Sequence, residues 1–108
     1  MKNSSNSEFF QVMINFDKKD PFDIWADSYF NSDRMRVMIP KFQAIESFQK
    51  YIDNYHFTAQ RFSNELERYC REKQLCLNPE ELKNSGGRVI RKYKNRATEM
   101  IYIQPNEY

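Results

Sequence analysis

Apolar residues recur at helical spacing in three segments of the chain. The first segment follows Asp20, which precedes the proline at position 21. An aspartate N-cap followed by a proline at the first helical position is typical of a helix start. The apolar positions that then follow are Ile24, Trp25, Ala26, Tyr29 and Phe30. We expect this helix to end at the Asn-Ser-Asp turn of residues 31–33.

The second and third helical segments flank a short turn at residues 54–57. The second segment, Lys41 to Asp53, keeps Phe42, Ile45, Phe48 and Ile52 three or four residues apart. Thr58 is a strong N-cap residue, and the third helix runs from it to Lys73. Two helices joined by a tight turn predict a helix-turn-helix. The inward faces are expected to bury Trp25, Phe42, Phe48, Phe62, Leu66, Tyr69 and Cys70.

Alternating apolar and polar residues predict three strands. Arg34 to Ile39 alternates and ends at a proline. Two further strands, Arg88 to Tyr93 and Thr98 to Ile103, are separated by a polar turn at residues 94–96. Alternation places Arg88, Ile90 and Lys92 on one face of this hairpin and Val89, Arg91 and Tyr93 on the other.

The order of these elements predicts a winged helix, an α+β fold in which a C-terminal β-hairpin forms the wing. The strand ending at Ile39 would pair with the hairpin, and the third helix would be the recognition helix that enters a DNA major groove. The predicted domain covers residues 20–104, after a flexible or linker lead-in (1–19) and before a tail (105–108). Residues 9–16, FFQVMINF, fit either a short strand or a linker docked on the domain.

Charge is concentrated in the hairpin, although the whole chain carries a net charge of only +2. Six basic residues and no acid lie from Lys83 to Arg96, whereas the remaining residues hold eleven basic and fifteen acidic side chains. This asymmetry indicates a localised anionic partner, with a merely solvated hairpin as the alternative. The residues expected to contact DNA phosphates, or in the case of the tyrosine to stack on a base, are Arg88, Arg91, Lys92, Tyr93, Lys94 and Arg96.

The polar face of the third helix is the second candidate DNA-binding surface. Arg61, Asn64, Arg68 and Arg71 recur at a spacing of three or four residues and would follow a groove. Glu65 and Glu67 weaken this prediction, because they can pair with the nearby arginines as surface salt bridges. The wing is therefore the stronger half of the prediction.

No convergent set of catalytic or metal-binding residues is evident. Cys70 and Cys76 are six residues apart, His56 is the only histidine, and no CxxC or HxxxH motif occurs. The two glycines, Gly86 and Gly87, are not part of a GK[ST] phosphate-binding loop. We therefore predict a protein that is not an enzyme and has no cofactor, metal or small-molecule substrate. The two cysteines make no disulfide framework, and neither a signal peptide nor a membrane-spanning run occurs, which favours a cytoplasmic location.

Several short motifs resemble those of a known family. They are Asp23-x-Trp25, the segment FQAIESFQKYI (42–52), Thr58-x-x-x-Phe62-x-x-x-Leu66-x-x-Tyr69-Cys70, Leu77-Asn78-Pro79, Gly87-Arg88 and Ile101-Tyr102-Ile103. Together they resemble the small C-terminal winged-helix domain that follows the superfamily 3 helicase in phage, plasmid and mobile-element primase-helicases. Poxvirus primase-helicases carry a related arrangement. The resemblance covers residues 20–103, mostly at core and turn positions.

This resemblance implies an accessory DNA-binding module without ATPase or primase chemistry. The chain would be a fragment of a larger protein or a free-standing relative, with the helicase part of the same polypeptide as a further partner. Two alternatives stay open: a winged helix that docks a helicase or replication partner through its aromatic and acidic surface, and a free-standing transcriptional regulator. The absence of an obvious dimerisation helix counts against the regulator.

Overall fold

The first described helix begins at the predicted signal. The structure is a computed structural model that describes residues 20–106, and α2 spans Pro21–Tyr29. The side chain of Asp20 accepts a hydrogen bond from the backbone N–H of Phe22 at 2.8 Å, so the predicted N-cap is confirmed. The segment 9–16 lies outside the described residues.

The strand predicted over Arg34–Ile39 is wrong for most of its length. A 3-10 turn, η1 (Ser32–Arg34), takes up its start, and only β1 (Ile39–Pro40) is a strand. Arg36 has a φ of 59°, in the left-handed region, so the backbone cannot be extended there. Its N–H donates instead to the carbonyl of Ile103 at 2.8 Å. This contact with a distant segment is not encoded in local alternation.

The two helices of the predicted pair are confirmed to within about a residue. α3 spans Lys41–Ile52 and α4 spans Ala59–Glu72. Asp53 ends α3 with a φ of 56°, a common left-handed C-terminal conformation. Thr58 Oγ1 accepts a hydrogen bond from the N–H of Arg61 at 3.1 Å, which caps α4 as expected.

The hairpin consists of β3 (Val89–Tyr93) and β4 (Arg96–Ile101). Tyr93 pairs with Arg96, so the turn contains only Lys94 and Asn95. Their φ angles of 51° and 67° match a type I′ turn, whose twist suits a β-hairpin. The second strand therefore begins two residues earlier than predicted. β4 also pairs with β1, as expected, in a three-stranded antiparallel sheet of order β1-β4-β3.

A second, two-stranded sheet was not predicted. It joins β2 (Leu75–Leu77) to β5 (Ile103–Pro105), and η2 (Glu80–Leu82) follows β2. Three residues are too few to display a strand period, so no strand was predicted at Leu75–Leu77. Ile103 was predicted to end the hairpin strand, with the tail beginning at residue 105. Asn78 extends the link between the two segments: its N–H donates to the carbonyl of Tyr102 at 2.7 Å, and its Oδ1 accepts from the Tyr102 N–H at 2.9 Å.

An aromatic core joins the three helices. The ring of Phe22 lies edge-on to its four aromatic neighbours at centroid distances of 5.0–6.1 Å. The neighbours are Trp25, Phe48, Phe62 and Tyr69. The predicted burial of Trp25, Phe48, Phe62, Tyr69 and Cys70 is confirmed. Phe42, also predicted to face inward, and Ile24 of the first apolar stripe are each 44% exposed. Phe42 packs instead against the hairpin, with its ring centroid 6.0 Å from that of Tyr93.

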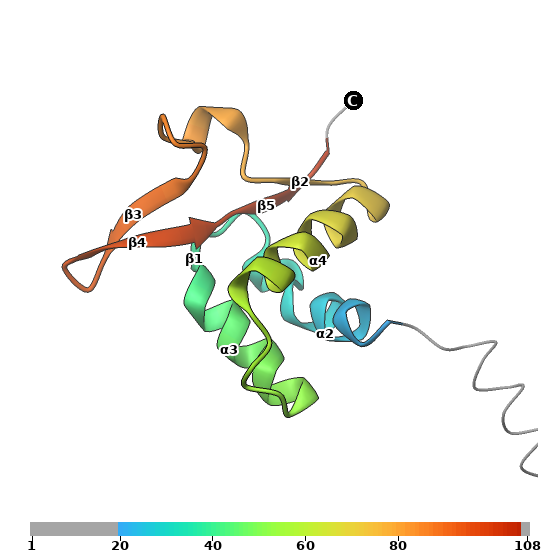
Figure 1. The fold of residues 1–108 in the computed structure, drawn as a ribbon. Helices are drawn as coiled ribbons and strands as arrows, with labels where there is room; N and C mark the ends of the chain where they lie inside the picture. The colour runs from blue at the N-terminus through green and yellow to red at the C-terminus, as the bar shows by residue number, and fades with distance from the viewer. Residues whose placement is uncertain (1–19, 107–108) are drawn as a thin grey trace, which may run out of the picture.

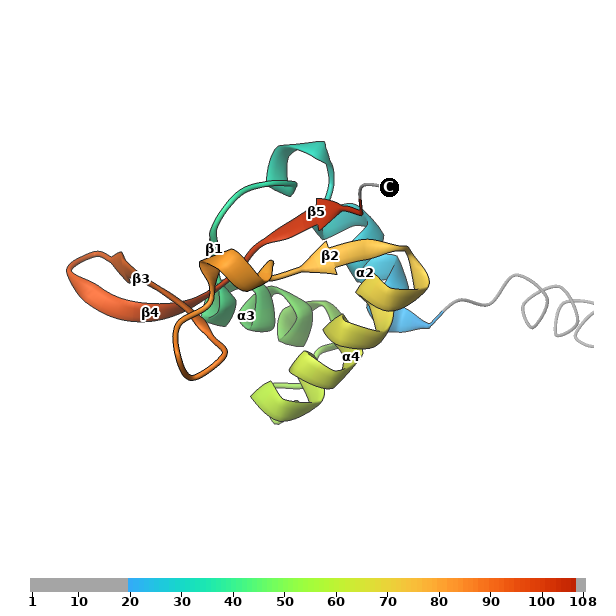
Figure 2. The same ribbon diagram turned by 90° about the horizontal axis from the view of Figure 1, so that it is seen from above.

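The arrangement leaves the hairpin projecting from the helical body. Figures 1 and 2 both show β3 and β4 extending beyond the helices, while β2 and β5 lie beside α4. Within residues 20–106, no helix has the length and apolar character needed to cross a membrane. The described fold is thus an α+β domain of three helices and two antiparallel sheets.

Candidate nucleic-acid interface

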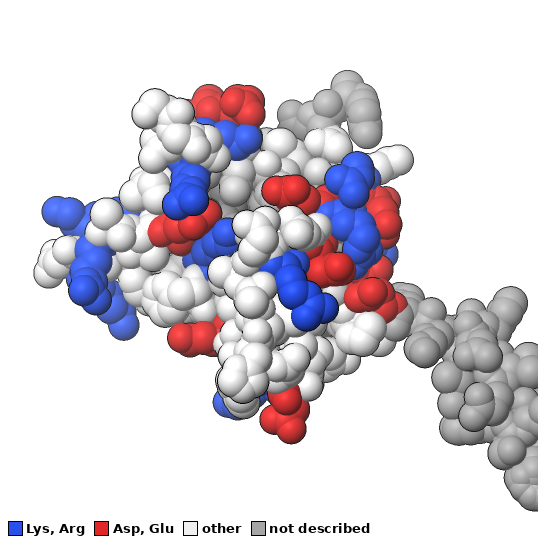
Figure 3. Space-filling view, in the orientation of Figure 1, with Lys and Arg blue, Asp and Glu red and all other residues white. Residues whose placement is uncertain are grey.

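The hairpin presents its basic side chains to solvent. The five basic residues of this region are Arg88, Arg91, Lys92, Lys94 and Arg96. Each is exposed, and none takes part in the ion pairs found among residues 20–106. In Figure 3 the projecting end of the hairpin carries basic side chains and no acidic ones, whereas the surface over α2 and α4 mixes both. The hairpin end is therefore a region of uncompensated positive charge.

The strand register distributes this charge around the ribbon. Lys92 lies opposite Ala97, and Arg91 lies opposite Thr98. Directly paired residues share a face and successive residues alternate, so Lys92 and Arg91 lie on different faces. The guanidinium of Arg91 donates to the carbonyl of Ile90 at 2.8 Å. The predicted alternation of basic residues over both faces is confirmed.

Lys94 occupies the tip of the hairpin in a backbone conformation that is unfavourable for lysine. Its φ of 51° lies in the left-handed region, where an L-residue other than glycine or asparagine costs about 1–2 kcal/mol. Type I′ turns favour Asn-Gly at the two central positions, and here they hold Lys94 and Asn95. A strained residue is a reason to look for a function at that position, and the charge of Lys94 is the property that asparagine or glycine would lack.

Tyr93, predicted to stack on a base, also makes contacts within the fold. Gln43 Nε2 donates a hydrogen bond to Tyr93 Oη at 2.6 Å, and Phe42 lies edge-on to the ring. Both partners belong to the first turn of α3. The Nζ of Lys94 lies 5.4 Å from the centroid of the Tyr93 ring. Tyr93 therefore contacts α3 through both its hydroxyl and its ring.

A groove of about 240 Å³ separates the hairpin from α4. Its charged lining comprises two basic and two acidic residues, and one pair of them, Lys41 and Glu99, forms an ion pair at 3.3 Å. Arg88 and Glu67 are the other two charged residues that line it. Lys41 was not identified from the sequence, because only the fold brings the start of α3 against β4.

The exposed face of α4 carries three of the four residues predicted to follow a groove: Arg61, Asn64 and Arg71. The guanidinium of Arg61 lies 4.6 Å above the ring of Phe57, and Asn64 Oδ1 accepts a hydrogen bond from Gln60 Nε2 at 3.1 Å. Among the ion pairs found in residues 20–106, none joins Arg71 to Glu67. Arg61 and Arg71 give this polar surface two positive charges, and exposed Glu67 on the same helix offsets one of them.

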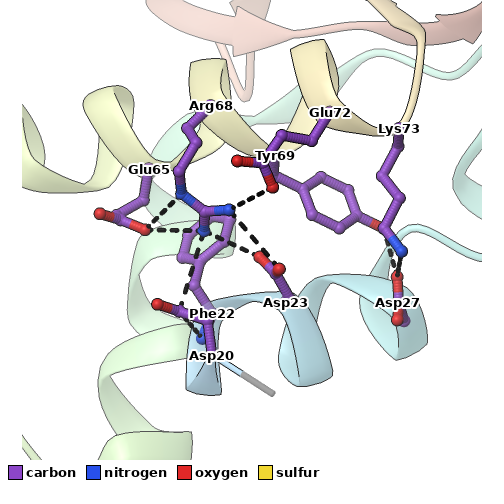
Figure 4. Close-up of polar contacts among 9 residues, drawn as sticks. All are labelled: Asp20, Phe22, Asp23, Asp27, Glu65, Arg68, Tyr69, Glu72 and Lys73. Atoms are coloured by element: carbon purple, nitrogen blue, oxygen red, sulfur yellow. Dashed lines mark hydrogen bonds and ion pairs between the residues drawn. The ribbon is translucent and has the colours of Figure 1, made fainter. Parts of the chain in front are cut away.

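The fourth residue, Arg68, lies elsewhere, in a cluster of carboxylates between α4 and α2 (Figure 4). Its guanidinium lies 2.8 Å from Asp23, 2.8 Å from Glu65, 2.9 Å from Glu72 and 3.8 Å from Asp20. Hydrogen bonding to Asp23 raises the pKa of Arg68 above its already high ordinary value. The predicted Glu65–Arg68 salt bridge is confirmed, and it occupies the guanidinium that was expected to follow a groove.

Other polar groups near the end of α4 are structural. The hydroxyl of Tyr69 donates to Asp27 Oδ1 at 2.7 Å, and burial raises the pKa of this phenol above its ordinary range. Burial also raises the pKa of the free Cys70 thiol to about 12, with a smaller contribution from Cys76. A buried, protonated thiol is a poor nucleophile. In the described part of the chain, no group of three or more His, Cys, Asp and Glu residues is arranged to hold a metal ion.

No protein-family model matches the chain, no curated protein matches its sequence and no solved structure matches its fold.

Proposed function

We propose that this domain is a winged helix that binds DNA through the β3–β4 hairpin, as an accessory domain of a replication primase-helicase. The observation that carries the proposal is the set of five exposed basic side chains, unpaired within the described residues; four lie on the projecting two-stranded ribbon, and Arg88 directly precedes it. The order helix, β1, helix pair, hairpin and the pairing of β1 with β4 support the winged-helix assignment.

Phosphate contact follows from the physical chemistry of the hairpin. Lysine and arginine side chains that neutralise phosphates release condensed counterions, and this release supplies sequence-independent affinity that falls with salt. The ribbon is narrow and carries cations on both faces and at the tip, so it would lie along or between phosphate rows. The strained Lys94 is the foremost of these cations.

Helix α4 has the lesser role in this proposal. Its exposed face offers Asn64 and Arg71 to a groove, but Glu67 lies between them in sequence and would be repelled by phosphates. Arg68 is occupied by carboxylates and is not proposed as a DNA contact. Most of the affinity is thus assigned to the wing.

The test is DNA binding over a salt series with matched charge losses. The wing variant Lys92→Ala/Lys94→Ala should weaken duplex binding at low salt and lower the slope of log K against log salt by about two. The control Lys50→Ala/Lys73→Ala removes the same charge from exposed lysines outside the hairpin and should change the slope much less. No binding at low salt, or equal losses in the two variants, would refute the proposal.

The assignment to a primase-helicase is supported only by the resemblance of the core and turn motifs. It is tested by the coding sequence on either side of these residues. A superfamily 3 helicase upstream in the same reading frame supports it. A neighbouring region without such a helicase would contradict it, leaving DNA binding as a separate question.

A further inference from the structure

A hollow opens at the end of α3 that is remote from the hairpin. The hairpin packs against Phe42 and Gln43, in the first turn of α3, whereas the hollow is lined by Ile52, its last residue. Ten residues of helix separate Phe42 from Ile52, which corresponds to about 15 Å. The hollow is therefore a surface distinct from the proposed DNA interface.

The walls of the hollow are apolar. Phe22, Phe48, Ile52 and Phe57 line it, and its volume is about 220 Å³. A cavity of about 150 Å³ lined by such residues is large enough for a benzene ring. One aromatic or branched aliphatic side chain would therefore fit.

The rim of the hollow is acidic. Asp20 and Glu65 stand on it, and both belong to the cluster around Arg68, in which four carboxylates face one guanidinium. Arg61 adds one positive charge to the rim, with its guanidinium over the Phe57 ring at 4.6 Å. Among the described residues, the rim and the cluster hold four carboxylates and two guanidinium groups, an excess of two negative charges.

These properties define the chemistry of an occupant. A negative rim repels nucleic acid and attracts lysine and arginine, and an apolar hollow gains from burying an apolar side chain. We propose that the hollow docks a basic segment of a protein partner. One aromatic or branched aliphatic side chain of that segment would enter the hollow, and flanking lysines or arginines would face Asp20 and Glu65.

Two binding surfaces at opposite ends of α3 would give the domain a bridging role. The positive hairpin and the negative hollow contact opposite ends of α3. The docking proposal stands on its own observations and would survive the loss of the DNA proposal.

The test uses the full chain and a fluorescein-labelled probe peptide, Lys-Lys-Phe-Ile-Lys-Lys. Amide chemical shifts of the isotopically labelled protein should change around Asp20, Ile52, Phe57 and Glu65, and fluorescence anisotropy should give a saturable, salt-sensitive affinity. A peptide with serines in place of Phe-Ile, and another with glutamates in place of the lysines, should each bind much more weakly. Equal binding of all three peptides, or no shift changes with millimolar probe, would overturn the proposal.

Variants of the protein locate the binding. Asp20→Asn/Glu65→Gln removes the rim charges while asparagine keeps the helix cap, and should weaken the probe about threefold to tenfold. Ile52→Ser should weaken it about tenfold by reducing the apolar wall. The wing variant Lys92→Ala/Lys94→Ala should bind the probe as the parent does. Loss of binding in this variant would show that the peptide binds the hairpin instead of the hollow, and would overturn the proposal.

The chain itself supplies a competing occupant, because Phe16, Lys18 and Lys19 precede Asp20 in sequence. Replacement of these three residues by serine removes the competitor and keeps the identity of every described residue that lines the hollow. Unchanged probe affinity in this variant supports a site for a separate partner. A severalfold rise in affinity would assign the hollow to the chain's own segment and overturn the proposed partner.

Discussion

Gln43 and Tyr93, fifty residues apart, are joined by a hydrogen bond of 2.6 Å that ties the hairpin to α3. The amide of Gln43 donates, and the phenol oxygen of Tyr93 accepts. Because Phe42 packs against the same ring, one tyrosine makes both a polar and an apolar contact with the first turn of α3. These two contacts, together with the β1–β4 pairing and the Lys41–Glu99 ion pair, hold the basic hairpin against the helices.

Removal of the Tyr93 hydroxyl should loosen the hairpin without removing the ring contact. Tyr93→Phe leaves Gln43 without this partner and should lower the free energy of unfolding by about 0.5–1.5 kcal/mol, measured by urea denaturation. Amide hydrogen exchange in β3 and β4 should accelerate. Tyr55→Phe is the control, because Tyr55 is 63% exposed and its loss of a hydroxyl should change stability little. Equal effects of the two substitutions would contradict the role given to Tyr93.

Replacement of Lys94 should raise the stability of the fold and weaken DNA binding. Lys94→Asn relieves the left-handed strain and should raise the free energy of unfolding by about 0.5–1 kcal/mol. The same change removes one cation and should lower the salt slope of DNA binding by about one. Asn95→Gly is the matched change at the next position: it should stabilise the turn while leaving the charge intact. Salt-series binding and thermal unfolding of both variants give the comparison.

Arg68 and Arg71 lie on one helix and should behave in opposite ways. Arg68→Met leaves its carboxylate neighbours without their shared cation and should lower the free energy of unfolding by about 1–2 kcal/mol, an estimate reduced for their partial solvent exposure. Arg71→Met, at an exposed position, should change stability by less than about 0.5 kcal/mol. DNA affinity should fall for Arg71→Met and hold for folded Arg68→Met. If DNA affinity fell for Arg68→Met and held for Arg71→Met, the assignment of the groove contact to Arg71 would be wrong.

Cys70 should make folding sensitive to alkaline pH. Burial raises the pKa of its thiol to about 12, above the 9.0 of an unperturbed thiol, so the folded state retains a proton that the unfolded state releases. The stabilisation is complete below about pH 9 and is lost as pH rises towards 12. Between about pH 8.5 and 10.5 the free energy of unfolding should fall by about 1–2 kcal/mol more in the parent than in Cys70→Ala. Parallel pH profiles in urea titrations of the two proteins would contradict this prediction.

Local signals in the sequence predicted the helices well. Asp20 and Thr58 each cap a helix. Asp20 accepts a hydrogen bond from the backbone N–H two residues later, and Thr58 accepts one from the backbone N–H three residues later. Such contacts form without reference to the rest of the fold, so a short stretch of sequence is enough to recognise them. The positive hairpin is local in the same sense, because its strands are adjacent in the chain.

Contacts between distant segments were beyond the reach of such patterns. β2 exists because Leu75–Leu77 finds β5 as a partner, and Arg36 turns away from a strand because its N–H meets the carbonyl of Ile103. Apolar periodicity could not tell that Phe42 would cover the hairpin instead of the core. In each case the deciding partner lies far away in the sequence.

The same distinction between local signals and contacts between distant segments applies to the candidate surfaces. The sequence by itself determined that positive charge gathers between Lys83 and Arg96, since that depends only on residue type and order. Only the tertiary structure decided that Arg68 faces Asp23 rather than a groove, and that Asp20 and Glu65 share the rim of an apolar hollow. Charge is a property of single residues, whereas the availability of a charge depends on which neighbours the fold brings within bonding distance.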